Sequence, residues 1–111
     1  MGMKLSRGFS VKGATERAFE LTQSYVTGMN YHVESSNKPN LLALRRGSKW
    51  TLSTKIENVL TKLAISFTQK GEIVYVLCDF EVQAPAIYTS GDRATLENEV
   101  EKLRAFLETA L

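Results

Sequence analysis

The side chains best suited to chemistry form a basic cluster in the middle of the sequence. Its members are Arg45, Arg46, Lys49, Trp50 and Lys55. Arginine binds phosphate through two parallel hydrogen bonds, backbone amides such as those of Gly47-Ser48 can enclose an anion, and an aromatic ring can stack on a nucleic-acid base. The cluster predicts an anion-binding or nucleic-acid-binding site. The structural alternative is that Trp50 plugs one end of a sheet.

Residues that could catalyse a reaction are few. His32 is the sole histidine and falls on the polar side of a predicted strand, where a solvent-facing imidazole is the simplest interpretation. Cys78 falls on the same side of its predicted strand as apolar residues, so we expect its thiol to be buried. Burial makes a thiol a poor nucleophile. Asp79 and Glu81 share one strand face, at a spacing that suits paired-carboxylate chemistry or cation binding, although exposed strands commonly carry such residues for solvation.

Motifs of known catalytic or cofactor sites are missing from the sequence. It contains no phosphate-binding loop, dinucleotide fingerprint, zinc-ligand spacing or nucleophile elbow. We therefore predict no catalytic residues, no metal site and no cofactor, and the chain resembles a binding protein more than an enzyme. A small hydrolase or isomerase that uses Asp79, Glu81 or His32 is the enzymatic alternative.

The net charge of +2 conceals an asymmetry along the chain. Residues 1–62 carry ten Lys and Arg against four Asp and Glu, whereas residues 63–111 carry four against eight. A folded domain with this split has a dipolar surface, which suits an anionic ligand or self-association. The sequence pI of about 8.8 lies below the range of dedicated nucleic-acid binders, so a short or local anion fits the basic cluster better than a long duplex.

Length and composition predict a single α+β domain over residues 1–111. The chain is 43% apolar and 23% charged, and a chain of this length buries roughly two-thirds of its unfolded surface on folding. No apolar stretch approaches the ~20 residues of a membrane-spanning helix, and the N-terminus lacks the apolar block of a signal peptide. We expect a cytoplasmic protein without a membrane partner. Its one cysteine cannot form an intramolecular disulfide.

A long β-hairpin over residues 62–83 is the element that must position these side chains. Two runs of alternating apolar residues flank the polar turn Thr68–Glu72. Outside it, the same criteria predict in order a strand over 3–12, a helix over 14–27, strands over 31–36 and 41–46, an irregular segment over 47–61 and a helix after candidate caps at 90–92. The predicted fold is a two-layer sandwich with order β-α-β-β-β-β-α, in which both helices cover one face of an antiparallel five-stranded sheet.

The strand-to-helix entry FSVKGATERAF at residues 9–19 and the long closing helix resemble those of small helix-grip domains and TATA-binding-protein-like domains. The resemblance covers nearly the whole chain in element order and length, and no family motif matches residue by residue. It implies the same two-layer fold. Helix-grip relatives often hold apolar ligands between helix and sheet, and TATA-binding relatives bind DNA on the open sheet face, so the resemblance implies these two kinds of partner.

The sheet face opposite the predicted helices carries small and weakly polar residues. Ser66, Tyr75 and Leu77 lie on it. A lone two-layer domain normally covers its wet face with long polar side chains, and a smooth, sparsely charged face is typical of a surface that another copy covers. We predict a non-catalytic binding domain that forms a homodimer through this face and holds a small apolar or anionic ligand. Nucleic-acid binding is the alternative function, and an ordinary exposed sheet is the structural alternative.

Overall fold

The computed structural model describes residues 3–48, 55–83 and 90–111. Its elements are, in chain order, β1 (Met3–Lys12), α1 (Thr15–Thr27), β2 (His32–Asn37), β3 (Leu41–Arg46), the 3₁₀ turn η1 (Ile56–Asn58), β4 (Thr61–Lys70), β5 (Ile73–Val82) and α2 (Ser90–Ala110). The predicted order of strands and helices is confirmed. Lys49 and Trp50 of the predicted basic cluster lie outside the described residues.

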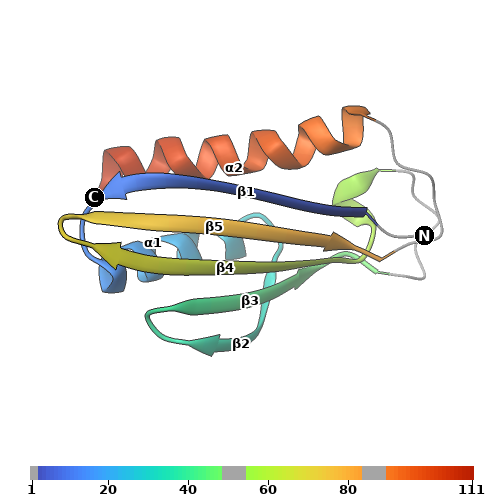
Figure 1. Ribbon diagram of the computed structural model, residues 1–111. Helices are drawn as coiled ribbons and strands as arrows, with labels where there is room; N and C mark the ends of the chain where they lie inside the picture. Colours follow the sequence, from blue (N-terminus) through green and yellow to red (C-terminus); the bar gives the residue numbers. More distant parts are fainter. Residues whose placement is uncertain (1–2, 49–54, 84–89) are drawn as a thin grey trace.

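The strands form an antiparallel sheet in the order β1-β5-β4-β3-β2, so β4 is its middle strand (Figure 1). The β4–β5 hairpin is the predicted one, but its turn is shorter than Thr68–Glu72. Pairing continues to Lys70 and Ile73, which leaves Gly71 and Glu72 as the turn. Gly71 adopts φ +61°, and glycine at this position lets two strands join through two residues.

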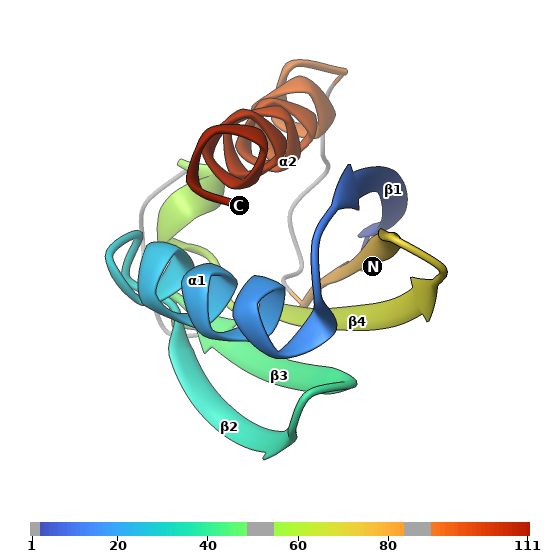
Figure 2. The same ribbon diagram turned by 90° about the vertical axis from the view of Figure 1, so that its left-hand side faces the viewer.

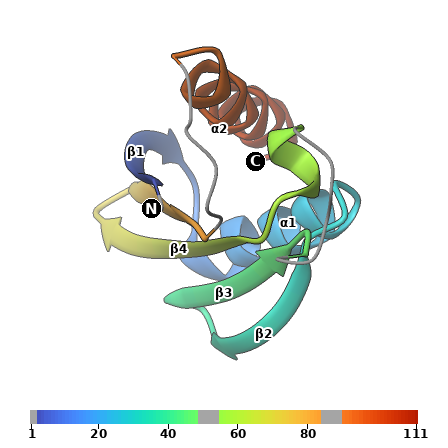
Figure 3. The ribbon, with the colours of Figure 1, turned by 90° about the vertical axis from the view of Figure 1, so that its right-hand side faces the viewer.

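Both helices lie on the same side of the sheet, and the sheet curves around them (Figure 2). The opposite end view shows the other face of the sheet without a helix on it (Figure 3). α2 runs along β1 and is held there by Arg7, whose Nε donates to Glu97 Oε2 at 2.8 Å. α1 meets α2 through the stacked rings of Tyr25 and Phe106, whose centroids are 4.6 Å apart.

The core fills the space between the helices and the inner sheet face. The alternating residues of β4 and β5 supply much of it. The apolar stripe of α2 is buried as well, with Leu96, Val100, Leu103 and Leu107 at most 5% exposed. Phe19 of α1 is also buried and packs edge-on against Phe67 of β4 at 5.6 Å between ring centroids. This contact packs α1 against the middle strand of the sheet.

Helix ends differ in detail from the sequence prediction. The backbone N–H of Thr15 donates to Gln69 Oε1 at 2.9 Å, and Gln69 Nε2 donates to the carbonyl of Gly13. A glutamine from the central hairpin thus caps α1 in place of a local side chain. α2 already begins at Ser90, so the residues proposed as caps at 90–92 belong to its first turn.

Candidate functional site

The outer face of the sheet lies opposite both described helices, and neither of them covers it (Figure 2 and Figure 3). Strand register places its residues in rows that run across the strands. From β1 to β3, three of these rows are Lys4, Glu81, Lys62 and Arg45; Ser6, Asp79, Ala64 and Ala43; and Gly8, Leu77, Ser66 and Leu41. One end of this outer face therefore carries a fully charged row, and the next two rows hold small or apolar residues apart from Asp79.

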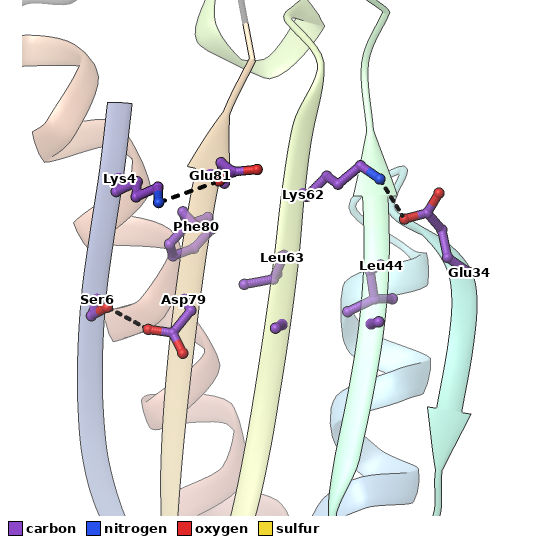
Figure 4. A pocket seen from close by; sticks show the side chains of 11 residues that line it. Lys4, Ser6, Glu34, Leu44, Lys62, Leu63, Asp79, Phe80 and Glu81 are labelled. Atoms are coloured by element: carbon purple, nitrogen blue, oxygen red, sulfur yellow. Dashed lines mark hydrogen bonds and ion pairs between the residues drawn. The ribbon is translucent and has the colours of Figure 1, made fainter. Parts of the chain in front are cut away.

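A shallow hollow of about 520 Å³ lies at the charged end of the outer face (Figure 4). Its floor is low because β3 and β4 carry the short side chains of Ala43 and Ala64 there. Ion pairs border it: Lys4 Nζ lies 3.7 Å from Glu81 Oε2, and Lys62 Nζ lies 3.6 Å from Glu34 Oε1.

Two further polar residues complete the border of the hollow. The Ser6 hydroxyl donates to Asp79 Oδ1. A hydrogen bond from Gln83 and the charge of Lys4 lower the pKa of the Glu81 carboxyl, while partial desolvation opposes them. Glu81 is thus ionised at neutral pH. The predicted carboxylate pair, Asp79 and Glu81, sits on this face with each member engaged by its own polar neighbour rather than by the other.

The apolar part of the outer face lies next to the hollow. Leu41 and Tyr75 are 41% and 42% exposed, and Leu77 is half-buried. The Tyr75 ring lies across Gly8, since a Cβ at Gly8 would stand 2.2 Å from the Tyr75 hydroxyl oxygen. Ser66 lies between Leu41 and Leu77 in the register. The three residues predicted for self-association therefore occur together on the open face.

The predicted basic cluster is divided by the strand phase of β3. Arg45 points to the outer face, where its Nε is 3.9 Å from Glu34 Oε2, and Lys55 is exposed near η1. Arg46 has the opposite phase and is buried. Lys49 and Trp50 lie outside the described residues, so the cluster is not seen as one surface.

Arg46 instead forms a buried polar contact beneath α2. Its Nη2 donates to Glu99 Oε2 at 2.9 Å, and the Tyr31 hydroxyl donates to Glu99 Oε1 at 3.0 Å. The guanidinium carbon lies 4.2 Å from the centroid of the Tyr31 ring. Burial, followed by the charge of Glu99, raises the pKa of Tyr31. The side chains of Arg46 and Glu99 are only 5% and 12% exposed, so this contact fastens α2 to β3.

The remaining candidates for chemistry are separated. Cys78 is buried in the core, and this burial raises the pKa of its thiol to about 12. His32 is exposed on the edge strand β2. Within the described ranges, no three His, Cys, Asp or Glu side chains are arranged as metal ligands would be. The space between helices and sheet that Tyr31, Cys78 and Glu99 help to line measures about 10 Å³, which is about the room one water needs.

No family model matches the sequence, and no curated protein is similar to it in sequence. Solved structures that share its fold include the following three. The Aha1 dimer from Colwellia psychrerythraea, solved in solution, has a TM-score of 0.66 and 9% identity and covers 98% of this chain and 96% of its own. Ara h 8.0201 has a TM-score of 0.61 and 3% identity, with 99% and 97% covered.

The third structure is TTHA0849 from Thermus thermophilus, with a TM-score of 0.51, 13% identity and coverage of 96% and 95%. At such low identity these likenesses describe the fold alone. They support the helix-grip part of the sequence resemblance and not its TATA-binding part. The described part of the chain also holds no helix long and apolar enough to cross a membrane. The chain therefore has a helix-grip-like α+β fold.

Proposed function

We propose that this protein is a non-catalytic interaction domain that pairs with a second copy of itself through the outer face of the sheet. The observation that carries the proposal is the exposure of Leu41 and Tyr75, 41% and 42%, beside half-buried Leu77 on a sheet face that neither described helix covers. Apolar side chains gathered on one open face are typical of a surface that a partner buries. Small neighbours such as Ser66 allow another sheet to approach closely.

A second copy is the simplest partner for this face. Homodimers with two-fold symmetry are the commonest soluble oligomers, and they require a surface that is complementary to itself. The outer face carries both signs of charge at one end, so it can offer opposite charges to its own copy. The solved structure with the TM-score of 0.66 is itself described as a dimer, which is consistent with pairing in this fold.

Binding of a small ligand or of nucleic acid is less well supported. The space of about 10 Å³ beneath α2 would have to widen before an apolar or anionic molecule could enter. Arg46 is engaged with Glu99 inside the protein, which leaves Arg45 and Lys55 as the exposed described members of the basic cluster. Phosphate binding through these two residues with Lys49 and Trp50 stays a prediction.

Charged substitutions on the outer face test the proposed function. Tyr75→Glu and Leu77→Glu should each weaken dimerisation by about tenfold or more, because a carboxylate would lose water where the partner packs. The measurement is the molar mass by light scattering after size exclusion, over a dilution series. Ala105→Glu is the matched control, since it adds the same charge at an exposed position of α2. An unchanged mass for both outer-face variants would remove this face as the interface.

A further inference from the structure

We propose that the two copies pair about a two-fold axis that runs along β4, so that β5 of each copy packs over β3 of the other. This inference rests on the proposed self-association and adds its geometry. The starting observation is that β4 is the middle strand, with β5 on one side and β3 on the other. The axis is parallel to β4 and lies between the two sheets. A two-fold rotation about it keeps each row of the outer face at its level along the strands and places the β5 member of the row over the β3 member of the other copy.

The shape of the sheet favours contact along its middle. Because the sheet curves around its helices (Figure 2), its outer face is convex, and β4 lies at the middle of this face. On this strand Ala64 and Ser66 point outward. Short side chains at the axis let two sheets approach to the usual spacing of about 10 Å. Aligned packing, with strand directions within about 30° of each other, is one of the two common arrangements of stacked sheets.

The apolar residues match under this rotation. Leu77 and Leu41 are the register neighbours of Ser66 on its two sides. Exchange of β5 and β3 therefore places Leu77 of one copy over Leu41 of the other, twice in the dimer. Two side chains that are exposed or half-buried in a single copy would thus cover each other.

The charges match as well. In the next charged row, Glu81 and Arg45 are the register neighbours of Lys62 on its two sides. The rotation brings Glu81 of each copy to Arg45 of the other. Within one chain these two residues stand two strands apart, roughly 10 Å, so they do not pair there. Lys62 meets its own copy near the axis, where its ion pair with Glu34 at 3.6 Å moderates the repulsion.

The other simple two-fold arrangement has its axis across the strands, and the charges oppose it. Rotation about the row of Leu77 and Ser66 would lay each strand over its own copy in reverse. Lys12 and Lys70, which flank Ile73 at the far end of the hairpin, would then stand over Lys4 and Lys62. Lysine over lysine is repulsive on both β1 and β4 in that arrangement. The axis along β4 leaves such contacts only between the β4 lysines, Lys62 and Lys70, and their own copies, and it also brings Glu81 to Arg45, so it is the better match.

A charge exchange between subunits tests this geometry. Arg45→Glu and Glu81→Lys each place like charges together twice in their own homodimers, so each should dimerise about tenfold more weakly than the unsubstituted protein. A mixture of the two variants restores opposite charges at both contacts and should form heterodimers selectively. Native mass spectrometry distinguishes the species when one variant is labelled with ¹⁵N. The double variant, Arg45→Glu with Glu81→Lys in one chain, should form homodimers again.

The outcomes separate the geometry from the self-association itself. Preferential heterodimers and a restored double variant would support the axis along β4. Dimers of both single variants that are as tight as the unsubstituted dimer and mix at random would overturn this axis while leaving self-association intact. A monomeric unsubstituted protein would overturn both proposals. Circular dichroism of each variant shows whether a weakened dimer still consists of folded chains, and the double variant provides the test if a single variant does not fold.

Discussion

Replacing Arg46 by alanine is expected to lower the free energy of unfolding by about 3–5 kcal/mol, because it leaves the Glu99 carboxylate buried without its cationic partner. The contact is 2.9 Å long, and the two side chains are 5% and 12% exposed. The Tyr31 hydroxyl, at 3.0 Å from Glu99, can satisfy only one of the carboxylate oxygens. The measurement is urea unfolding followed by circular dichroism, with linear extrapolation to water.

The matched control for this prediction is Arg104→Ala on α2. Arg104 also pairs with a glutamate, Glu101, at 3.0 Å, but these two side chains are 45% and 60% exposed. An exposed pair contributes about 0–1 kcal/mol, so the control should unfold nearly as the unsubstituted protein does. Replacing both buried partners, as in Arg46→Met with Glu99→Leu, should recover much of the lost stability. Equal effects of Arg46→Ala and Arg104→Ala would contradict the buried contact.

Substitution of Gly47 by alanine is expected to destabilise the fold by at least about 2 kcal/mol. Gly47 follows directly on Arg46 and adopts φ +82°, where a Cβ would stand 2.3 Å from the carbonyl oxygen of Val59. The left-handed conformation alone costs alanine about 1–2 kcal/mol, and the contact with backbone forces the chain near η1 to move as well. Thermal and urea unfolding measure the effect.

Gly71→Ala is the control that separates these two costs. Gly71 adopts φ +61° in the β4–β5 turn, and nothing lies within 4 Å of the position of its added Cβ. This variant should therefore lose only the conformational part, about 1–2 kcal/mol. If Gly47→Ala were no more destabilising than Gly71→Ala, the close approach of Val59 to Gly47 would be contradicted.

The periodic parts of the fold could be predicted from sequence because local spacing reports burial. The alternating residues of β4 and β5 and the four-and-three spacing of Leu96, Val100 and Leu103 face the core as expected. The element order follows from these runs and the turns between them. The open face could be predicted for the same reason, since each strand that buries one set of residues exposes the other.

The buried polar contact was missed, although the sequence carries signals for it. Arg46 shares the phase of Leu42 and Leu44 on β3, and Glu99 lies three residues after Leu96 and four before Leu103, within the apolar stripe of α2. When each of two elements carries a charged residue at a position of its buried side, and the two charges are opposite, an ion pair between the elements is expected. Because Arg46 directly follows Arg45 in the sequence, both arginines were assigned to one basic cluster instead.

Contacts between distant segments could not be predicted from local patterns. The cap that Gln69 provides for the N–H of Thr15 spans 54 residues, and nothing in the spacing around either residue indicates it. The predicted strand over 31–36 is present as β2, and all six residues of β2 are exposed. The reason is that β2 forms the sheet edge, and which strand becomes an edge depends on the pairing of all the others.

The most direct test of the proposed self-association is native mass spectrometry of the unsubstituted protein, sprayed from a volatile buffer at micromolar concentration. We predict a main species with twice the mass of one chain and without a bound small molecule, and the dimer should give way to folded monomers in Leu77→Glu. A single-chain mass at every concentration would contradict the proposal that the outer face pairs two copies. A single-chain mass with a discrete added molecule would instead identify a ligand-binding domain.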